Sequence, residues 1–281
     1  MRITHLEIFH GLVAAGMKMR YGSKPCRRAV LRVLWEKKHI MDAGFVDYYL
    51  MAFWLFRHYA DSMGIGFWAR GAVASSIVCY CLRLTEVDPL KYGLHASRFV
   101  NDELPKFQFD IEASRYEEFM KGAEDLLQAN AKDYDIPAIR ECLFKDVKPF
   151  EYLSRKQDNP LPENLDDEFA RYALYFPQTM DLYETYIQNP KCDLLIFQEE
   201  MLDIFKNVFH VSNIKANQIR LSIQRGEMEQ VEAFRKEVFD ASALPDEEKE
   251  KAWKRLISNP RAFLKAHAVS RVLASYKYKI K

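Results

Sequence analysis

The stretch LPKFQFDIE at residues 104–112 decides the fold class, because polar and apolar side chains alternate along it. Its two phenylalanines and its isoleucine share one face of an extended chain, and Gln108, Asp110 and Glu112 share the other. A period of two is typical of a β-strand that buries one face. The sequence therefore predicts a strand over residues 104–112.

Helical patterns surround this strand. Apolar residues recur at helical spacing over Ile3–Lys18, and a second helix is predicted over about Cys26–Met41. Gly22 and Pro25 separate the two segments. The predicted inner face of the second helix comprises Val30, Leu31, Val33 and Leu34.

The other long segments are helical or ambiguous. Phe45–Met63 is either a buried strand that enters a helix or one buried helix, because periodicity alone does not distinguish the two. Ala72–Leu82 has the small and apolar residues of a tightly packed helix, and the chain is almost wholly helical from Ser114 onward. The proline-containing stretch 157–163 is the predicted boundary between two lobes. We expect a helix-dominated α/β (α+β) fold with a small sheet.

Composition excludes several classes of protein. The 281 residues carry 41 Lys and Arg against 40 Asp and Glu, so tight DNA binding by net charge alone is not expected. The five cysteines form no CxxC pair, which argues against a zinc site or a disulfide framework. No signal peptide opens the sequence, and its most apolar window is too short and too charged to span a bilayer. We therefore expect a cytoplasmic protein without a membrane partner.

Several motifs of the N-terminal half occur in an order that resembles a known family. Leu6–Gly22 ends in GMKMRYG, which is similar to "G-L-x-x-R-Y-G", and Ala43–Met51 is similar to "G-F-x-x-Y-F-L-I". Arg70–Tyr80 resembles "G-R-G-S-x-A-G-S-L-V-A-Y", and Thr85–Tyr92 resembles "I-T-D-V-D-P-L-K-Y". Arg98–Asn101 is similar to "E-R-F-L-N-P". These motifs are those of the alpha subunit of bacterial DNA polymerase III, a C-family DNA polymerase.

The C-terminal half continues the same order. Ala173–Pro177 resembles "A-L-Y-R-P-G", and Phe197–Glu200 resembles "Y-Q-E-Q". Ala216–Arg225 resembles the fingers segment "A-D-x-L-R-R-A-x-G-K-K", and Phe263–Ala268 resembles "F-N-K-S-H-A". The resemblance implies a palm-like region over residues 1–156 and a helical fingers-like region over residues 164–281. It also implies that the family's PHP, clamp-binding and OB parts, and a piece near residues 113–165, are missing.

The resemblance implies a catalytic metal site on the predicted strand, and two alignments are open. The family's "P-D-I-D-I-D-F" strand supplies two catalytic carboxylates for metal-assisted nucleotidyl transfer. With the prolines aligned, those positions become Lys106 and Gln108, and the site is lost. A shifted alignment makes Asp110 and Glu112 the catalytic and metal-binding pair, which would hold Mg²⁺ in an active enzyme. Asp146 is the candidate third carboxylate, or alternatively a solvated loop acid.

The same resemblance implies a set of nucleotide- and phosphate-binding residues. It also leaves two candidate functions open. One reading is a DNA polymerase III alpha-like protein of DNA replication or repair, with primer–template DNA, dNTPs and replication proteins as partners. The alternative is a catalytically inactive relative that acts as a DNA-binding or replication-partner scaffold, so enzyme activity is left open. The candidate phosphate-binding residues are Arg70, Gly71, Arg220, Arg225, Lys265 and His267.

Overall fold

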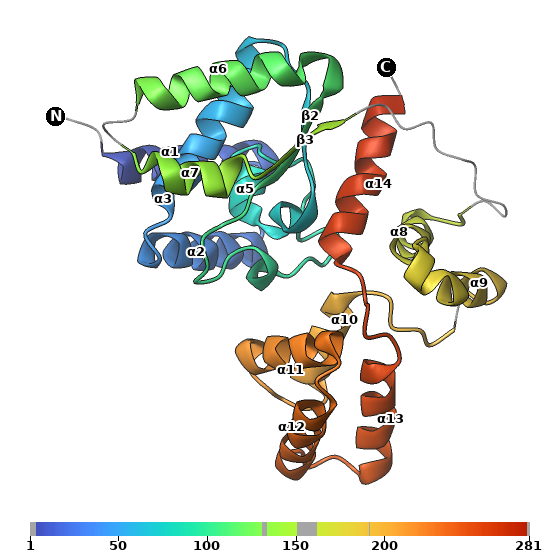
Figure 1. Cartoon of the computed structure of the whole chain (residues 1–281). Coiled ribbons are helices and arrows are strands. Elements are labelled where there is room, and N and C mark those ends of the chain that lie inside the picture. Colours follow the sequence, from blue (N-terminus) through green and yellow to red (C-terminus); the bar gives the residue numbers. More distant parts are fainter. Residues whose placement is uncertain (1–3, 131–133, 151–161, 191, 280–281) are drawn as a thin grey trace. The chain divides into compact units, whose positions relative to one another are not determined.

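The computed structural model describes residues 4–130, 134–150, 162–190 and 192–279, and it has the helix-dominated α/β fold that the sequence predicts (Figure 1). Contacts divide the chain into two compact units. The first comprises Met1–Arg155 and Val269–Lys281, and the second comprises Lys156–Ala268. The expected boundary at residues 157–163 falls mostly on residues 157–161, which lie outside the described residues.

Helices form most of the first unit. Thr4 caps the first of them, because its hydroxyl accepts a hydrogen bond from the Glu7 amide while the Glu7 carboxylate accepts one from the Thr4 amide. The segment Phe45–Met63, for which the sequence left a strand or a helix open, is helical over Val46–Ser62, with a π-helical stretch in its middle. The helices are α1 (His5–Tyr21), α2 (Arg27–Asp42), α3 (Val46–Ala52), π-helical η1 (Phe53–Tyr59), α4 (Ala60–Ser62), α5 (Ile77–Cys81), α6 (Tyr116–Ala129) and α7 (Ile136–Leu143). Short 3₁₀ turns are η2 (Gly71–Ser75), η3 (Ala96–Arg98) and η4 (Ala113–Arg115).

A three-stranded sheet in the order β1-β2-β3 positions the candidate site. The strands are β1 (Phe67–Ala69), β2 (Gln108–Glu112) and β3 (Asp146–Phe150). The central strand β2 runs antiparallel to β1 and parallel to β3, and α6 and α7 make the crossover that a parallel pair requires. The predicted strand is confirmed over residues 108–112. The expectation that the chain is almost wholly helical after Ser114 is wrong at β3.

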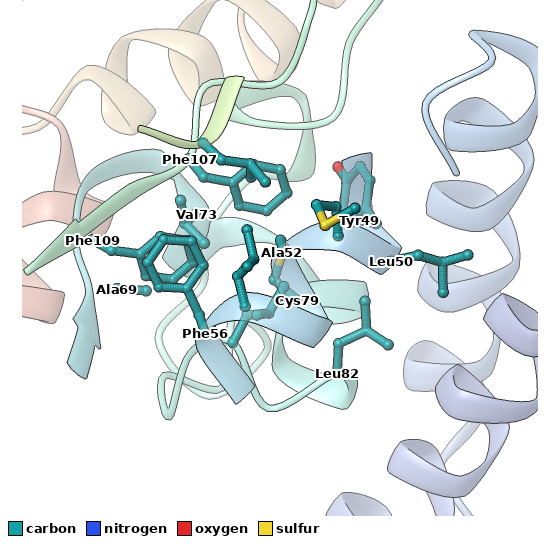
Figure 2. Packing of buried hydrophobic residues seen from close by; sticks show 14 of the residues in the cluster. Tyr49, Leu50, Ala52, Phe56, Ala69, Val73, Cys79, Leu82, Phe107 and Phe109 are labelled. Carbon is teal, nitrogen blue, oxygen red and sulfur yellow. The ribbon is translucent and has the colours of Figure 1, made fainter. Parts of the chain in front are cut away.

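The apolar face of β2 forms the centre of the first core (Figure 2). Phe109 stacks on Phe56 of η1 with ring centroids 3.8 Å apart, and Phe107 meets Tyr49 of α3 edge to face at 5.3 Å. Such aromatic pairs add stability beyond the area that they bury. The alternation of β2 thus works as predicted, with its aromatic face inward and its polar face directed toward other charged groups.

Helix α2 presents a different face to the core from the predicted one. Val33 is buried as expected, but Leu31 is 54% exposed and Leu34 is 56% exposed, and Val30 is also exposed. The helix buries Glu36 instead, because that carboxylate receives hydrogen bonds from the start of α5. The helix expected over Ala72–Leu82 is likewise two pieces, η2 and α5, which are separated at Ser76.

Gly16 of α1 lies against the backbone of α5. A Cβ atom at this position would lie 2.0 Å from the carbonyl oxygen of Cys81, whereas a Cβ at Gly11 of the same helix would meet nothing within 4 Å. We expect Gly16→Ala to lower the free energy of unfolding by about 1–3 kcal/mol, because the two helix backbones must separate. Gly11→Ala is the matched control, and we expect it to raise stability by up to about 1 kcal/mol. Urea unfolding of both variants tests this contrast, and equal stability of the two contradicts it.

The second unit is helical and has its own core, in which Phe205, Phe209 and Trp253 make edge-to-face and tilted ring contacts. Helix α14 (Lys265–Lys279) contributes to both units, since the division falls between Ala268 and Val269. The other elements are α8 (Leu165–Leu174), 3₁₀ turn η5 (Pro177–Thr179), α9 (Met180–Gln188), α10 (Gln198–Asn207), α11 (Asn213–Arg225), α12 (Met228–Ala241) and α13 (Asp246–Ile257). Within the described part of the chain, no helix combines the length and apolar character needed to cross a membrane.

Candidate functional site

Asp110 lies in the middle of β2 between two arginines. Its side chain is almost wholly buried, with the whole residue only 1% exposed. Arg70 Nε donates to Asp110 Oδ1 at 2.8 Å, and Arg271 Nη1 of α14 forms an ion pair with Asp110 Oδ2 at 2.6 Å. Oδ1 thus accepts a hydrogen bond, whereas the buried Oδ2 has the ion pair with Arg271 and no hydrogen-bond partner among the described residues. The two guanidinium charges stabilise the buried carboxylate.

Arg70 also ties β2 to β3. Its Nη2 donates to the carbonyl oxygen of Asp146 at 2.8 Å, and its amide donates to the carbonyl oxygen of Gln108 at 2.9 Å. The residue is 5% exposed, so its guanidinium is held inside the first unit. The predicted phosphate-binding arginine therefore contacts the predicted metal ligand Asp110 in this structure.

Gly71 follows Arg70 in a left-handed backbone conformation that residues with a side chain adopt only rarely. Its φ angle is +68°, and a Cβ atom there would lie 1.8 Å from Gln108 Oε1. The left-handed backbone therefore favours glycine, and any larger residue would also have to displace the Gln108 side chain. Its conformation positions Arg70 and Gln108, and no phosphate contact is needed to explain it.

Glu112 shares a face of β2 with Asp110 but has different neighbours. It is partly buried, and its Oε1 accepts a hydrogen bond from Ser114 Oγ at 3.0 Å. Its amide donates to the Gly66 carbonyl at 3.0 Å, which extends the pairing with β1. Strand geometry therefore places the two predicted carboxylates on one face, yet Asp110 alone makes the arginine contacts described above.

Asp146 opens β3 directly beside Gln108, with which it is in register. Gln108 Nε2 lies 3.4 Å from Asp146 Oδ2, a long hydrogen bond. The candidate third carboxylate is thus on a strand next to β2 and not in a loop. Its neighbour on β2 is an amide, and an amide supplies no charge for a metal ion.

The described side chains do not assemble a metal centre. Across residues 4–279, apart from the undescribed positions, no group of three His, Cys, Asp or Glu side chains could hold a metal ion. Asp110 is the better buried of the predicted pair, but its oxygens face Arg70 and Arg271. A divalent cation would have to displace both guanidinium groups, so the arrangement does not fit a bound metal.

The cysteines offer no nucleophile or metal thiolate at this sheet. Cys79, Cys81 and Cys142 are buried and free. Burial raises the pKa of the Cys81 thiol to about 12 and raises the pKa of the Cys142 thiol further. These thiols therefore stay protonated at neutral pH, whereas nucleophilic attack and metal ligation need the thiolate.

In the second unit, Arg220 and Arg225 of α11 have different environments. Arg220 is buried, and it donates from Nε to Asn217 Oδ1 at 3.1 Å and from Nη1 to Gln224 Oε1 at 2.9 Å. Arg225 has a side chain that is 63% exposed, with Glu227 3.7 Å away. Only Arg225 therefore presents its charge openly to solvent.

Lys265 and His267 open α14, and His267 borders a cavity of about 550 Å³. The His267 ring stacks on Tyr172 at 6.3 Å and meets Phe263 edge-on at 5.5 Å. The Lys265 amide donates to Glu199 Oε2 at 2.9 Å. Of the predicted phosphate-binding residues, His267 lines this cavity, and Arg220 is linked to it through Gln224, which accepts its hydrogen bond. Other lining residues are Phe176, Gln178, Thr179 and Arg261.

Two functional positions were missed by sequence reasoning. Arg271 carries no local signal, because a single arginine in a helix is ordinarily solvated. Its neighbour Ser270 is buried and accepts a hydrogen bond from Trp68 Nε1 at 2.9 Å, while its own hydroxyl donates to the Ala69 carbonyl. Docking of α14 on β1 therefore brings Arg271 to Asp110, and only the folded chain reveals this.

Comparison with known proteins gives a consistent family. Residues 7–130 match the model of the bacterial DNA polymerase III alpha NTPase domain. An error-prone DNA polymerase of Anaeromyxobacter sp. (strain K) is 32% identical over 122 residues, which cover 42% of this chain and 11% of the relative. The DNA polymerase III subunit alpha of Borreliella burgdorferi is 36% identical over 166 residues, which cover 56% of this chain and 14% of the relative.

The subunit alpha of Mycobacterium leprae is similar in the same way, with 36% identity over 117 residues, 40% of this chain and 10% of the relative. The chain thus spans between about a tenth and a seventh of the length of these curated relatives. The matched region 7–130 contains Arg70, Asp110 and Glu112, whereas Asp146 and Arg271 lie beyond it.

Proposed function

We propose that this chain, whose residues 7–130 match the model of the bacterial DNA polymerase III alpha NTPase domain, acts in DNA replication or repair on primer–template DNA and dNTPs. The observation that carries this is that the matched region folds into β1, β2 and the helices around them, with Asp110 and Glu112 on one face of β2. The family chemistry is template-directed nucleotidyl transfer, and the family suggests dependence on a divalent metal. We place the protein in the cytoplasm, with replication proteins as its partners.

The first candidate activity is nucleotidyl transfer, with Asp110 and Glu112 as the catalytic and metal-binding residues and Mg²⁺ as the metal. Arg70, Gly71, Arg220, Arg225, Lys265 and His267 are the proposed nucleotide and phosphate contacts. Residues 1–156 and 164–281 are the proposed palm-like and fingers-like regions. For this activity Asp110 must first be released by Arg70 and Arg271, since both hold its carboxylate.

A second candidate is a non-catalytic relative that binds primer–template DNA or docks on a replication partner. One specific observation favours it, namely that two guanidinium groups occupy Asp110 and that an amide, Gln108, stands beside Asp146. The two guanidinium groups balance the charge of Asp110 without a metal ion. The two candidates share the DNA ligand and differ only in chemistry.

Primer extension with purified protein separates the two candidates. For an active polymerase we expect extension that requires Mg²⁺ or Mn²⁺ and that is lost in Asp110→Ala and in Glu112→Gln. Metal-dependent extension that survives both substitutions contradicts the site assignment. Absence of extension by the wild-type protein leaves the non-catalytic candidate.

Salt-dependent DNA binding tests the function that both candidates share. We expect the chain to bind primer–template DNA at low salt and to lose affinity as salt rises, because phosphate contacts release counterions. Arg225→Gln should reduce the salt slope by about one contact, since this guanidinium is open to solvent. Lys236→Gln is the matched control, an exposed cation of the same unit with no proposed role. No binding at low salt contradicts direct action on DNA.

A further inference from the structure

A small cavity in the first unit is surrounded by an excess of cationic side chains. It has a volume of about 120 Å³ and lies where η1, β1, α14 and the turn after α5 meet. A water molecule occupies about 30 Å³ in the liquid, so the cavity has room for a group several times that size. Its charged and hydroxyl lining residues are Arg57, Arg83, Lys277, Thr85, Asp61 and Glu86.

Arg83 occupies a backbone position that ordinarily belongs to glycine. Its φ angle is +59°, and it ends α5 in a Schellman motif. The motif is complete, since the Leu84 amide donates to the Cys79 carbonyl at 2.9 Å and the Arg83 amide donates to the Tyr80 carbonyl at 3.1 Å. A long side chain in the left-handed region is unfavourable for the fold, which points to a use for the side chain itself.

The Arg83 guanidinium also has no anion to neutralise it. Over the part of the chain that the structure describes, it makes no ion pair and no side-chain hydrogen bond. Both acids at the cavity pair with other arginines, Asp61 with Arg57 of the same cavity at 2.8 Å and Glu86 with Arg20 at 2.7 Å. The positive charge of Arg83 therefore remains uncompensated beside the cavity.

Arg57, which also lines the cavity, has a guanidinium nitrogen without a hydrogen-bond acceptor among the described residues. Its Nη2 pairs with Asp61, but its Nε is buried and has no acceptor among the described residues. Burial lowers the pKa of the Arg57 guanidinium, and Arg83 lowers it further, although Asp61 acts in the opposite direction. An acceptor in the cavity would relieve both the missing hydrogen bond and the repulsion between the two arginines.

The remaining lining groups fit an oxyanion. Thr85 is buried, and its hydroxyl accepts a hydrogen bond from the Val87 amide at 3.2 Å while its own proton can be donated. Lys277 lies with its ammonium 5.2 Å above the ring of Trp68, which also lines the cavity. Guanidinium, ammonium and hydroxyl donors around one small volume match the tetrahedral acceptor geometry of phosphate.

We propose that this cavity binds one phosphate group, either as free inorganic phosphate or as a phosphodiester of a nucleic-acid backbone. The site stands apart from the Asp110 carboxylate and does not rest on the proposed function. Arg57 and Arg83 supply the charge, and Thr85 supplies a neutral donor. Arg83 is retained in an unfavourable backbone conformation because its side chain serves the anion.

Thermal unfolding in phosphate and in chloride at matched ionic strength tests the site. The wild-type melting temperature should be higher in phosphate, and Arg83→Gly and Arg57→Gln should abolish that difference. In chloride, Arg83→Gly should melt about 2–4 °C higher than wild type, because glycine suits the left-handed position and the repulsion of Arg57 is removed. Arg28→Gln, an exposed cation of α2, is the charge-matched control and should keep the phosphate effect.

Titration with inorganic phosphate and with a short single-stranded oligonucleotide distinguishes the two sources. Weakening of phosphate binding by about tenfold or more in Arg83→Gly supports free phosphate as the ligand. The same weakening with the oligonucleotide alone supports a backbone phosphodiester. If Arg83→Gly and Arg57→Gln bind both ligands as tightly as Arg28→Gln does, the cavity is not a phosphate site.

Discussion

Asp110→Asn should lower the free energy of unfolding by about 3 kcal/mol, measured by urea denaturation. The substitution leaves Arg70 and Arg271 without the carboxylate that neutralises them, and the Arg70 side chain is almost fully buried. Removing one partner of a buried ion pair costs about 3–5 kcal/mol, because the remaining charge is desolvated and unpaired. The lower end applies here because the Arg271 side chain is partly exposed.

Two further variants separate the ion pairs from a general loss of packing. Glu112→Gln lies on the same face of the same strand, and we expect it to change stability by less than about 1 kcal/mol, because its carboxylate is partly open to solvent. The double variant Asp110→Asn/Arg271→Gln should be more stable than Asp110→Asn alone, because one of the two uncompensated arginine charges is removed. A stability change below 1 kcal/mol in Asp110→Asn contradicts a structural role for this carboxylate.

The structural role of Asp110 changes how catalytic experiments must be interpreted. Loss of primer extension in Asp110→Ala would have two explanations, the loss of a metal ligand and the loss of the ion pairs that stabilise the sheet. Glu112→Gln is the more informative variant, because it leaves Arg70 and Arg271 paired. Loss of primer extension in Glu112→Gln at unchanged stability would support a metal ligand on β2.

The sequence predicts β2, the central strand of the first unit, but it does not predict the neighbouring strands β1 and β3, for a physical reason. Alternation identifies β2 because its aromatic face is buried. Strand β1 has only three residues, which is too short for any period to be visible, and β3 contains Lys148 and Pro149. Proline is tolerated at a sheet edge because no neighbour needs its amide, so β3 is an edge strand without a strand signal.

Periodicity also fails where a helix has apolar residues on two sides. Helix α2 offers Leu31 and Leu34 on one side and Val33 on another, and apolar content alone favours burying the leucines. The face of α2 that is buried is the one that carries Glu36, because this carboxylate accepts hydrogen bonds from amides of α5, which lies far away in the sequence. A rule that places charged residues on the surface therefore selects the wrong face.

The candidate site shows the same limit. Sequence reasoning places Asp110 and Glu112 on one face of a strand, which the structure reproduces, because that relation is local. It does not predict the hydrogen bond between Arg70 and Asp110, because nothing local in the sequence reveals that these two residues lie side by side. The partner on α14 is set by docking of Ser270 on Trp68 and Ala69, a contact between distant parts of the chain.

Glu36→Ala should lower the free energy of unfolding by about 3 kcal/mol or more. The carboxylate is fully buried and accepts hydrogen bonds from Ser76 Oγ at 2.7 Å, from the Ile77 amide at 3.2 Å and from the Val78 amide at 3.1 Å. Arg32 Nε pairs with it at 2.6 Å. Truncation leaves the two amides and the Ser76 hydroxyl without this acceptor, which is costly. It also removes the counter-charge of Arg32, although Arg32 Nη2 still donates to the carbonyl oxygens of Ser75 and Leu94.

Glu36→Gln tests whether charge or shape matters, since it keeps the size of the side chain. One carboxylate oxygen becomes an NH₂ donor, which would face the amides and the hydroxyl that now donate to Glu36, so we expect Glu36→Gln to be nearly as unstable as Glu36→Ala. Glu86→Gln is the control, an exposed carboxylate paired with Arg20, and it should lose less than about 1 kcal/mol. Wild-type stability of Glu36→Gln in urea unfolding would mean that α5 does not depend on the Glu36 charge, and the burial of this face of α2 would then need another cause.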